Sequence, residues 1–279
     1  MSELRTILNR FYREYDFRQR ILHDPIEFPR RYKNTGDIEI AGFLACCFAY
    51  GRIGLFKPVV EKILSVMGES PHDFLLHFSV TKQAKYFQGI QYRFNRNEDI
   101  ICLLFMLHII LRKDTSLESV FMTHYREADQ NIGNGLAALM DRFLSVDTTK
   151  LYGRNIKPSG LIQFFPSPAK GSTCKRSALF LRWMIRDKDI DLGIWKKIPK
   201  NKLVIPLDTH IMKISRCLGF TKRSSADWKT AVEITMALKQ FDPKDPLKYD
   251  FALCHHGISG ICRGEKEKSV CAECVFRNC

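Results

Sequence analysis

Apolar residues recur at the spacing of an α-helix along nearly the whole chain, whereas few segments alternate with a period of two. The first stripe of this kind consists of Leu4, Ile7, Leu8, Phe11 and Tyr15. An apolar run over residues 100–111 and amphipathic segments over residues 133–146 and 228–241 predict further helices. Residues 203–205, ahead of Pro206, are the one segment that favours an extended conformation. The spacing therefore predicts an all-α fold.

A segment rich in glycine and proline, residues 147–168, is the best candidate for a domain boundary. We expect an N-terminal helix within residues 1–36 that packs on the C-terminal lobe. A helical, barrel-like lobe is expected over residues 37–152, and a second lobe over residues 153–279. The second lobe would end in a cysteine-rich loop at residues 262–279.

Positive charge is concentrated in the C-terminal half of the chain. Residues 1–150 carry 20 basic and 18 acidic side chains, whereas residues 151–279 carry 24 basic and 12 acidic ones. Such an excess favours a polyanionic partner, because neutralising phosphates releases counterions. The charge fits RNA as well as double-stranded DNA, and a basic surface that only keeps the protein in solution is the alternative.

The sequence contains no apolar stretch of the length that a membrane-spanning helix needs. The longest run has twelve residues, whereas a spanning helix needs about 20. The N-terminal segment is charged and lacks the apolar region of a secretory signal. We therefore expect a cytoplasmic protein that does not bind a membrane, and we expect it to be a monomer.

Four cysteines lie close together at the C-terminus: Cys262, Cys271, Cys274 and Cys279. Their spacing is C-x8-C-x2-C-x4-C, and two ligands in a C-x2-C turn can present both thiolates to a single metal centre. Four thiolates suit Zn²⁺ as well as an Fe–S cluster, so the residue types leave both open. Most of the other six cysteines have apolar neighbours and are expected to fill the core, although Cys254 could also act as a ligand.

A lysine and an aspartate, each at the expected start of a helix, form a second candidate site. Asp208 stands where an N-cap residue belongs, and it would do so whether or not it has another role. Lys175 lies near the start of an earlier helix, where the helix dipole disfavours a cation. Lys175 is therefore a candidate amine nucleophile, or else it binds phosphate together with Lys170 and Arg176.

Three stretches of the C-terminal half, GSTCKRSALFL, VIPLDTHIMKISRCLGF and DFALCHHGISGIC, resemble the helix-hairpin-helix DNA glycosylase superfamily, in particular its endonuclease III branch. The resemblance covers about residues 165–279, and the whole chain also resembles a bacterial family of conserved hypothetical proteins. It implies that Lys175 attacks the sugar and that Asp208 caps the next helix and assists. It also implies that the four C-terminal cysteines hold a [4Fe–4S] cluster.

The resemblance implies a DNA base-excision repair glycosylase with AP-lyase activity that acts on a flipped, damaged base. The expected DNA contacts are Lys170, Gly171, Ser172, Arg176, Lys196, Lys197, Lys200 and Lys202. The chain departs from the endonuclease III pattern in its hairpin, which keeps Gly171 alone, and in the longer stretch between Lys175 and Asp208. These departures leave two alternatives open: a non-catalytic Fe–S or Zn nucleic-acid-binding protein of the same fold, and a redox or electron-transfer module.

Overall fold

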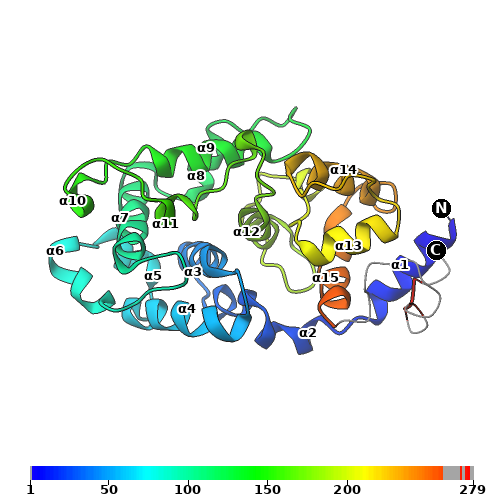
Figure 1. Ribbon diagram of the computed structural model, residues 1–279, viewed down its shortest axis with the longest axis horizontal. Coiled ribbons are helices and arrows are strands. Elements are labelled where there is room, and N and C mark those ends of the chain that lie inside the picture. The colour runs from blue at the N-terminus through cyan, green and yellow to red at the C-terminus, as the bar shows by residue number, and fades with distance from the viewer. Residues whose placement is uncertain (1, 260–270, 272–273, 277–279) are drawn as a thin grey trace. The chain divides into compact units, whose positions relative to one another are not determined.

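The computed structural model describes residues 2–259, 271 and 274–276, and its regular structure over these residues is helical (Figure 1). An isolated bridge between Tyr92 and Asn95 is the only β-type pairing in this described part of the chain. The prediction of an all-α fold is therefore confirmed. No helix among the described residues has both the length and the apolar character that crossing a membrane requires.

The chain divides into two compact units, and the first of them is discontinuous in sequence. Unit 1 consists of residues 1–20 and 171–279, and unit 2 consists of residues 21–170. The division at Lys170 lies later than the boundary expected at residue 152. The reason is that the segment rich in glycine and proline packs on unit 2: Phe165 stacks on Phe143 with ring centroids 4.6 Å apart.

Two helices of unit 2 are buried on nearly every side. The longer helices of this unit are α3 (Thr35–Phe48), α4 (Ile53–Met67), α7 (Asn97–Asp114) and α9 (Gly133–Leu144). Shorter helices lie between or after them: α5 (Pro71–Leu76), α6 (Val80–Gln83), α8 (Leu117–Met122), α10 (Thr149–Tyr152) and α11 (Ser159–Ile162). In α3 and α7 the apolar residues extend round the whole helix, as expected for the centre of a core.

The buried carboxylates of α3 cap other helices of unit 2. Glu39 accepts hydrogen bonds from the backbone N–H groups of Leu117 and Glu118 at 2.9 and 3.2 Å, at the start of α8. Asp37 accepts from the Ser70 hydroxyl and the His72 N–H, both at 2.9 Å, at the start of α5. The two acidic side chains therefore satisfy backbone donors that burial would otherwise leave unpaired.

Unit 1 joins the first helix of the chain to the helices of its C-terminal part. Its helices are α1 (Ser2–Glu14), α2 (Phe17–Arg20), α12 (Lys175–Ile185), α13 (Thr209–Cys217), α14 (Trp228–Lys239) and α15 (Asp250–Ile258). Side-chain hydrogen bonds tie α1 to later residues: Arg5 donates to the Gln240 carbonyl, and two tyrosine hydroxyls make further bonds. The Tyr249 hydroxyl donates to Asn9 Oδ1 at 2.9 Å, and the Tyr12 hydroxyl donates to Asp189 Oδ1 at 2.8 Å.

Buried ion pairs connect α12 to α15 inside unit 1. Arg182 of α12 pairs with Asp191 and Asp250. Arg186, the residue after α12, pairs with Asp189, Asp191 and Asp245. Because carboxylates outnumber guanidinium groups, burial is not fully compensated. Burial raises the pKa of Asp250 to about 6, with the Arg182 charge acting in the opposite direction. Burial raises the pKa of Asp191 as well.

Candidate active site

Asp208 caps helix α13, as its position in the sequence suggested. Residues 203–207, which are buried and form no regular secondary structure, lead into it. Its Oδ1 atom accepts hydrogen bonds from the backbone N–H groups of His210 and Ile211, each at 2.9 Å. An aspartate at this position satisfies two of the four N–H groups that a helix start leaves unpaired. The cap occupies Oδ1 and leaves Oδ2 for other contacts.

Lys175 is the first residue of α12, and a strained turn leads into it. The preceding residue, Cys174, has a φ of 51°, a left-handed conformation that costs a non-glycine residue about 1–2 kcal/mol. The Cys174 N–H donates to the Ser172 hydroxyl at 3.2 Å, and the Gly171 carbonyl accepts from the Trp228 N–H at 3.3 Å. Strain of this kind persists where the surrounding structure holds a residue in place, commonly at functional sites.

The two helix starts bring Lys175 and Asp208 together. Lys175 Nζ lies 3.4 Å from Asp208 Oδ2, the carboxylate oxygen that the helix cap does not use. The Lys175 side chain keeps 36% of its surface exposed and that of Asp208 keeps 13%. The pair is thus accessible from solvent on the side of the amine, whereas the carboxylate is largely enclosed. An amine beside a carboxylate that can accept its proton is an arrangement suited to nucleophilic catalysis.

A third polar group at this site was assigned to the core, or to metal binding, on the sequence alone. Cys254 of α15 is half-buried, and its thiol donates a hydrogen bond to Asp208 Oδ2 over a Sγ–Oδ2 distance of 3.7 Å. The same carboxylate oxygen therefore faces both the lysine and the cysteine. The contact depends on how α13 and α15 cross, so no local sequence pattern predicts it.

The hairpin residues that we expected to contact DNA divide between the two units. Lys170 ends unit 2, whereas Gly171, Ser172 and Arg176 belong to unit 1. Gly171 is exposed and left-handed, with a φ of 75°. Ser172 supports the turn before Lys175, and Arg176 is half-buried in the first turn of α12.

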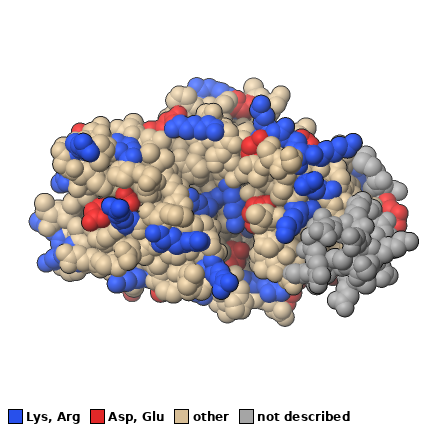
Figure 2. All heavy atoms as spheres, viewed as in Figure 1, with Lys and Arg blue, Asp and Glu red and all other residues tan. Residues whose placement is uncertain are grey.

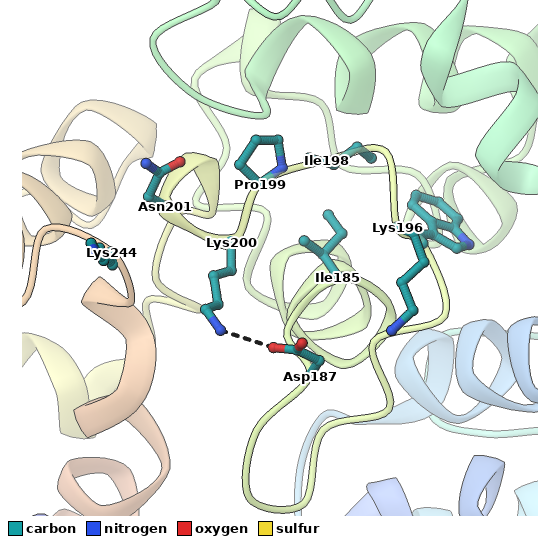
Figure 3. Close-up of a pocket in the computed structure, with 9 residues that line it drawn as sticks. Ile185, Asp187, Lys196, Ile198, Pro199, Lys200, Asn201 and Lys244 are labelled. Atoms are coloured by element: carbon teal, nitrogen blue, oxygen red, sulfur yellow. Dashed lines mark hydrogen bonds and ion pairs between the residues drawn. The ribbon is translucent and has the colours of Figure 1, made fainter.

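The basic residues between α12 and α13 form a separate group in unit 1. Lys200 pairs with Asp187 at 2.8 Å, and both line a pocket of about 330 Å³ floored by Ile185, Trp195 and Ile198. Lys196 lines it too, and Figure 3 shows the Lys196 and Lys200 side chains extending in the same direction. Lys197 is exposed and Lys202 is half-buried. The lining of this pocket includes neither Lys175 nor Asp208.

Acidic side chains accompany the basic ones on the surface. On the face drawn in Figure 2, lysine and arginine side chains are spread widely, with aspartate and glutamate among them. The face in view therefore carries both signs of charge, and basic side chains outnumber acidic ones on it.

Of the four expected metal ligands, Cys262 and Cys279 lie outside the described residues. The Cys274 N–H donates to the Cys271 carbonyl at 3.0 Å, so these two cysteines share one turn, which fits the presentation of two thiolates to a metal centre. The Cys274 thiol is buried, 3.6 Å from His256 Nε2 of α15. Burial lowers the pKa of His256 and so favours its neutral form. Among the described residues no three potential ligands gather at one point.

A rigid turn in unit 2 presents an arginine and a phenylalanine to solvent. Tyr92 and Asn95 exchange backbone hydrogen bonds of 3.0 and 2.8 Å, Arg93 has a φ of 50°, and Phe94 is 68% exposed. The buried Asn95 side chain accepts from the Tyr50 hydroxyl at 2.6 Å. The sequence analysis missed this turn, and the available signal was a single phenylalanine within the polar residues 91–98.

Comparison with known proteins gives one match. Residues 24–259 match the model of a family described as protein of unknown function (DUF2400), and this range includes Lys175, Asp208 and Cys254. The comparison with curated proteins gives no match. The comparison with solved structures gives none either. Because the match extends over most of the sequence and both units, the chain belongs to the DUF2400 family.

Proposed function

We propose that the protein is a DNA glycosylase with AP-lyase activity, in which Lys175 is the nucleophile and Asp208 assists it. The observation that carries the proposal is the 3.4 Å contact between Lys175 Nζ and Asp208 Oδ2. Two side chains distant in sequence are thus paired at two adjacent helix starts. The resemblance to helix-hairpin-helix glycosylases gives the same two residues the same roles, and the bundle would be the two-lobed fold of that superfamily.

The chemistry begins with a nucleotide turned out of the duplex, because a base inside the stack cannot be reached. Cleavage of the glycosidic bond builds positive charge on the sugar, which the Asp208 carboxylate stabilises. The neutral Lys175 amine forms a bond to C1′ as the bond to the base breaks, and the base leaves with a proton. The nitrogen then loses a proton and the C1′–O4′ bond breaks as the ring oxygen takes up a proton, which leaves a Schiff base between Lys175 and C1′. Removal of a C2′ proton, with departure of the 3′-phosphate, cleaves the strand by β-elimination.

Two surfaces support DNA as the partner. The basic segment that holds Lys196, Lys197, Lys200 and Lys202 supplies charge for the phosphate backbone. In unit 2 the exposed Phe94, next to Arg93, offers a face for stacking against an unpaired base. The proposal takes the protein to be a cytoplasmic monomer acting on damaged double-stranded DNA.

The proposal includes a metal centre held by Cys262, Cys271, Cys274 and Cys279, a [4Fe–4S] cluster or, alternatively, Zn²⁺. When bound, it would cross-link the C-terminal segment to unit 1, a structural role. The turn that joins Cys271 to Cys274 and the packing of Cys274 against α15 support it. The absorption spectrum and metal content of anaerobically purified protein separate Fe–S from Zn, and a colourless zinc protein would remove the redox alternative.

Borohydride trapping over a panel of damaged duplex oligonucleotides tests the proposal. Wild type is expected to form a covalent adduct with one of them, and Lys175→Ala is expected to form none while its DNA affinity changes less than about threefold. Lys213→Ala is the matched control, because Lys213 is an exposed lysine of α13 in the same unit. An adduct in Lys175→Ala would show that another residue is the nucleophile.

The same panel distinguishes the second candidate function. If wild type binds DNA but gives neither an adduct nor a released base, the protein is a non-catalytic nucleic-acid-binding protein. Oligonucleotides of RNA with the same sequences then decide between DNA and RNA as the ligand.

A further inference from the structure

Helix α15 turns two polar side chains toward neighbouring segments of unit 1. Asp250 and Cys254 are one helical turn apart, so they share a face of α15. Asp250 pairs with Arg182 of α12, and the Cys254 thiol donates to Asp208 at the start of α13. This face of α15 therefore meets both of the helices that carry the candidate catalytic pair.

The two carboxylate oxygens of Asp208 differ in how firmly their contacts hold them. Oδ1 is fixed by two backbone N–H groups at 2.9 Å, whereas Oδ2 has the Lys175 amine at 3.4 Å and the Cys254 thiol at 3.7 Å. Rotation about the Cβ–Cγ bond moves both oxygens together and has a broad energy minimum, so within the range that the two cap bonds allow, the position of Oδ2 depends on its own donors. A hydrogen-bond donor to Oδ2 restricts the range of orientations that the Asp208 carboxylate can adopt. Lys175 cannot supply this donor throughout the reaction, because its nitrogen becomes bonded to the substrate.

We propose that Cys254 is a positioning residue of the active site, whose thiol holds Asp208 Oδ2 toward the reacting centre. The role in catalysis rests on the proposed function, whereas the hydrogen bond between Cys254 and Asp208 can be tested independently of it. Sulfur is a weak donor, and the acceptor here is an enclosed carboxylate, which strengthens the bond. The cysteine needs no thiolate chemistry for this role: its S–H group donates, and the proton stays on sulfur.

The role predicts a graded series of variants at residue 254. Cys254→Ala removes the donor and is expected to slow borohydride trapping about tenfold, as expected for the loss of one modest hydrogen bond to a charged group. Cys254→Ser keeps a donor on the same face and is expected to stay within about threefold of wild type. The matched control is Cys217→Ala, which removes another half-buried thiol, at the far end of α13, and is expected to leave the rate unchanged.

A spectroscopic measurement tests the contact independently of activity. The S–H stretching band of Cys254 is obtained as the infrared difference between the full-length wild type and Cys254→Ala. In the Asp208→Asn background this band is expected to move to higher wavenumber, because an amide N–H₂ group replaces the accepting oxygen. Cys217→Ala is expected to leave the band in place.

The outcomes separate the two proposals. A band that does not respond to Asp208→Asn, or a Cys254→Ser variant as slow as Cys254→Ala, overturns the positioning role and leaves the proposed function standing. If wild type forms no adduct with any oligonucleotide, the proposed function fails, and the S–H band alone then decides whether Cys254 holds Asp208.

Discussion

Gly257 of α15 meets His210 of α13 so closely that a Cβ atom built on Gly257 would lie 2.7 Å from the His210 Cβ. Real Cβ atoms do not approach this closely, so the helix crossing requires glycine at this position. Asp208 and His210 belong to the same turn, and Cys254 lies one turn before Gly257. The close approach of these two helices therefore sets the distance between the Cys254 thiol and the Asp208 carboxylate.

Gly257→Ala is expected to push α15 away from α13. Overpacking of this kind costs about 1–3 kcal/mol of unfolding free energy, which urea denaturation measures. Trapping by borohydride is expected to slow as well, since Cys254 moves with the helix. Gly54→Ala in α4 is the control, because a Cβ there meets nothing within 4 Å and the substitution should be neutral or stabilising. Equal stability of Gly257→Ala and wild type would contradict the requirement for glycine.

Substitutions of Asp208 can separate its two roles. Asparagine caps helices as well as aspartate does, so Asp208→Asn is expected to unfold within about 0.5 kcal/mol of wild type. The charge is lost, and trapping is expected to fall at least about 100-fold, the scale on which preorganised electrostatic groups act. Asp208→Ala loses the cap too and is expected to cost about 1 kcal/mol more. A fully active Asp208→Asn protein would exclude a charged role for this residue.

The buried carboxylates of unit 1 predict a pH dependence of stability. Burial raises the pKa of Asp250 to about 6, above its value in the unfolded chain, so the folded protein holds this proton to a higher pH. Between about pH 4 and pH 6 the folded state binds more protons than the unfolded one, and the unfolding free energy falls as pH rises, by about 2 kcal/mol. Urea denaturation across this range measures the slope.

Asp250→Asn is expected to flatten that dependence, and the informative quantity is the difference between the variant and wild type at each pH. Asp141→Asn, which alters an exposed carboxylate of α9, serves as the control and should leave the slope as it is. If Asp250→Asn and wild type change equally in stability from pH 4 to pH 6, the arginines overcome the desolvation of Asp250.

The exposed turn of unit 2 predicts a base-stacking contact. Phe94→Ala is expected to raise the dissociation constant for duplex DNA with an unpaired or damaged base by about tenfold, at the lower end of what stacking contributes per base. Stability should change little, since Phe94 is 68% exposed. Leu55→Ala, at a 60% exposed residue of the same unit, is the control, and fluorescence anisotropy measures both. Equal losses in the two variants would leave Phe94 without a specific role.

Features that depend only on residues close together in the sequence could be predicted from it. The helical period gave the fold class, and the Asp208 cap follows from a residue type and the two residues after it. The start of α7 shows the limit of such patterns. Asn97, a residue type that favours the N-cap position, is the first residue of α7, whereas Arg96 occupies the cap, because Asp99 accepts from the Arg96 N–H at 2.9 Å.

Features that depend on how helices cross were not predictable. The pairing of Lys175 with Asp208 came from a family resemblance, since neither spacing nor composition fixes the distance between two helix starts. Cys254 looked like a core residue because its neighbours are apolar, and its contact depends on Gly257. The expected domain boundary had the composition of a linker, yet Asn95 binds the Gly160 carbonyl at 2.6 Å and holds that segment in unit 2.

The discontinuity of unit 1 has a consequence for how the protein is made. Ribosomes produce α1 before unit 2, whereas its partners Asp189 and Tyr249 follow only after the whole of unit 2. At about 5–20 residues per second, the stretch from Lys170 to Tyr249 takes about 4–16 s to synthesise, during which unit 2 can already fold. The apolar face of α1, which includes the fully buried Leu8, lacks these partners at least until residues 170–249 have been synthesised. Unit 1 is therefore completed only after unit 2 has been synthesised, from two segments of the nascent chain that lie on either side of it.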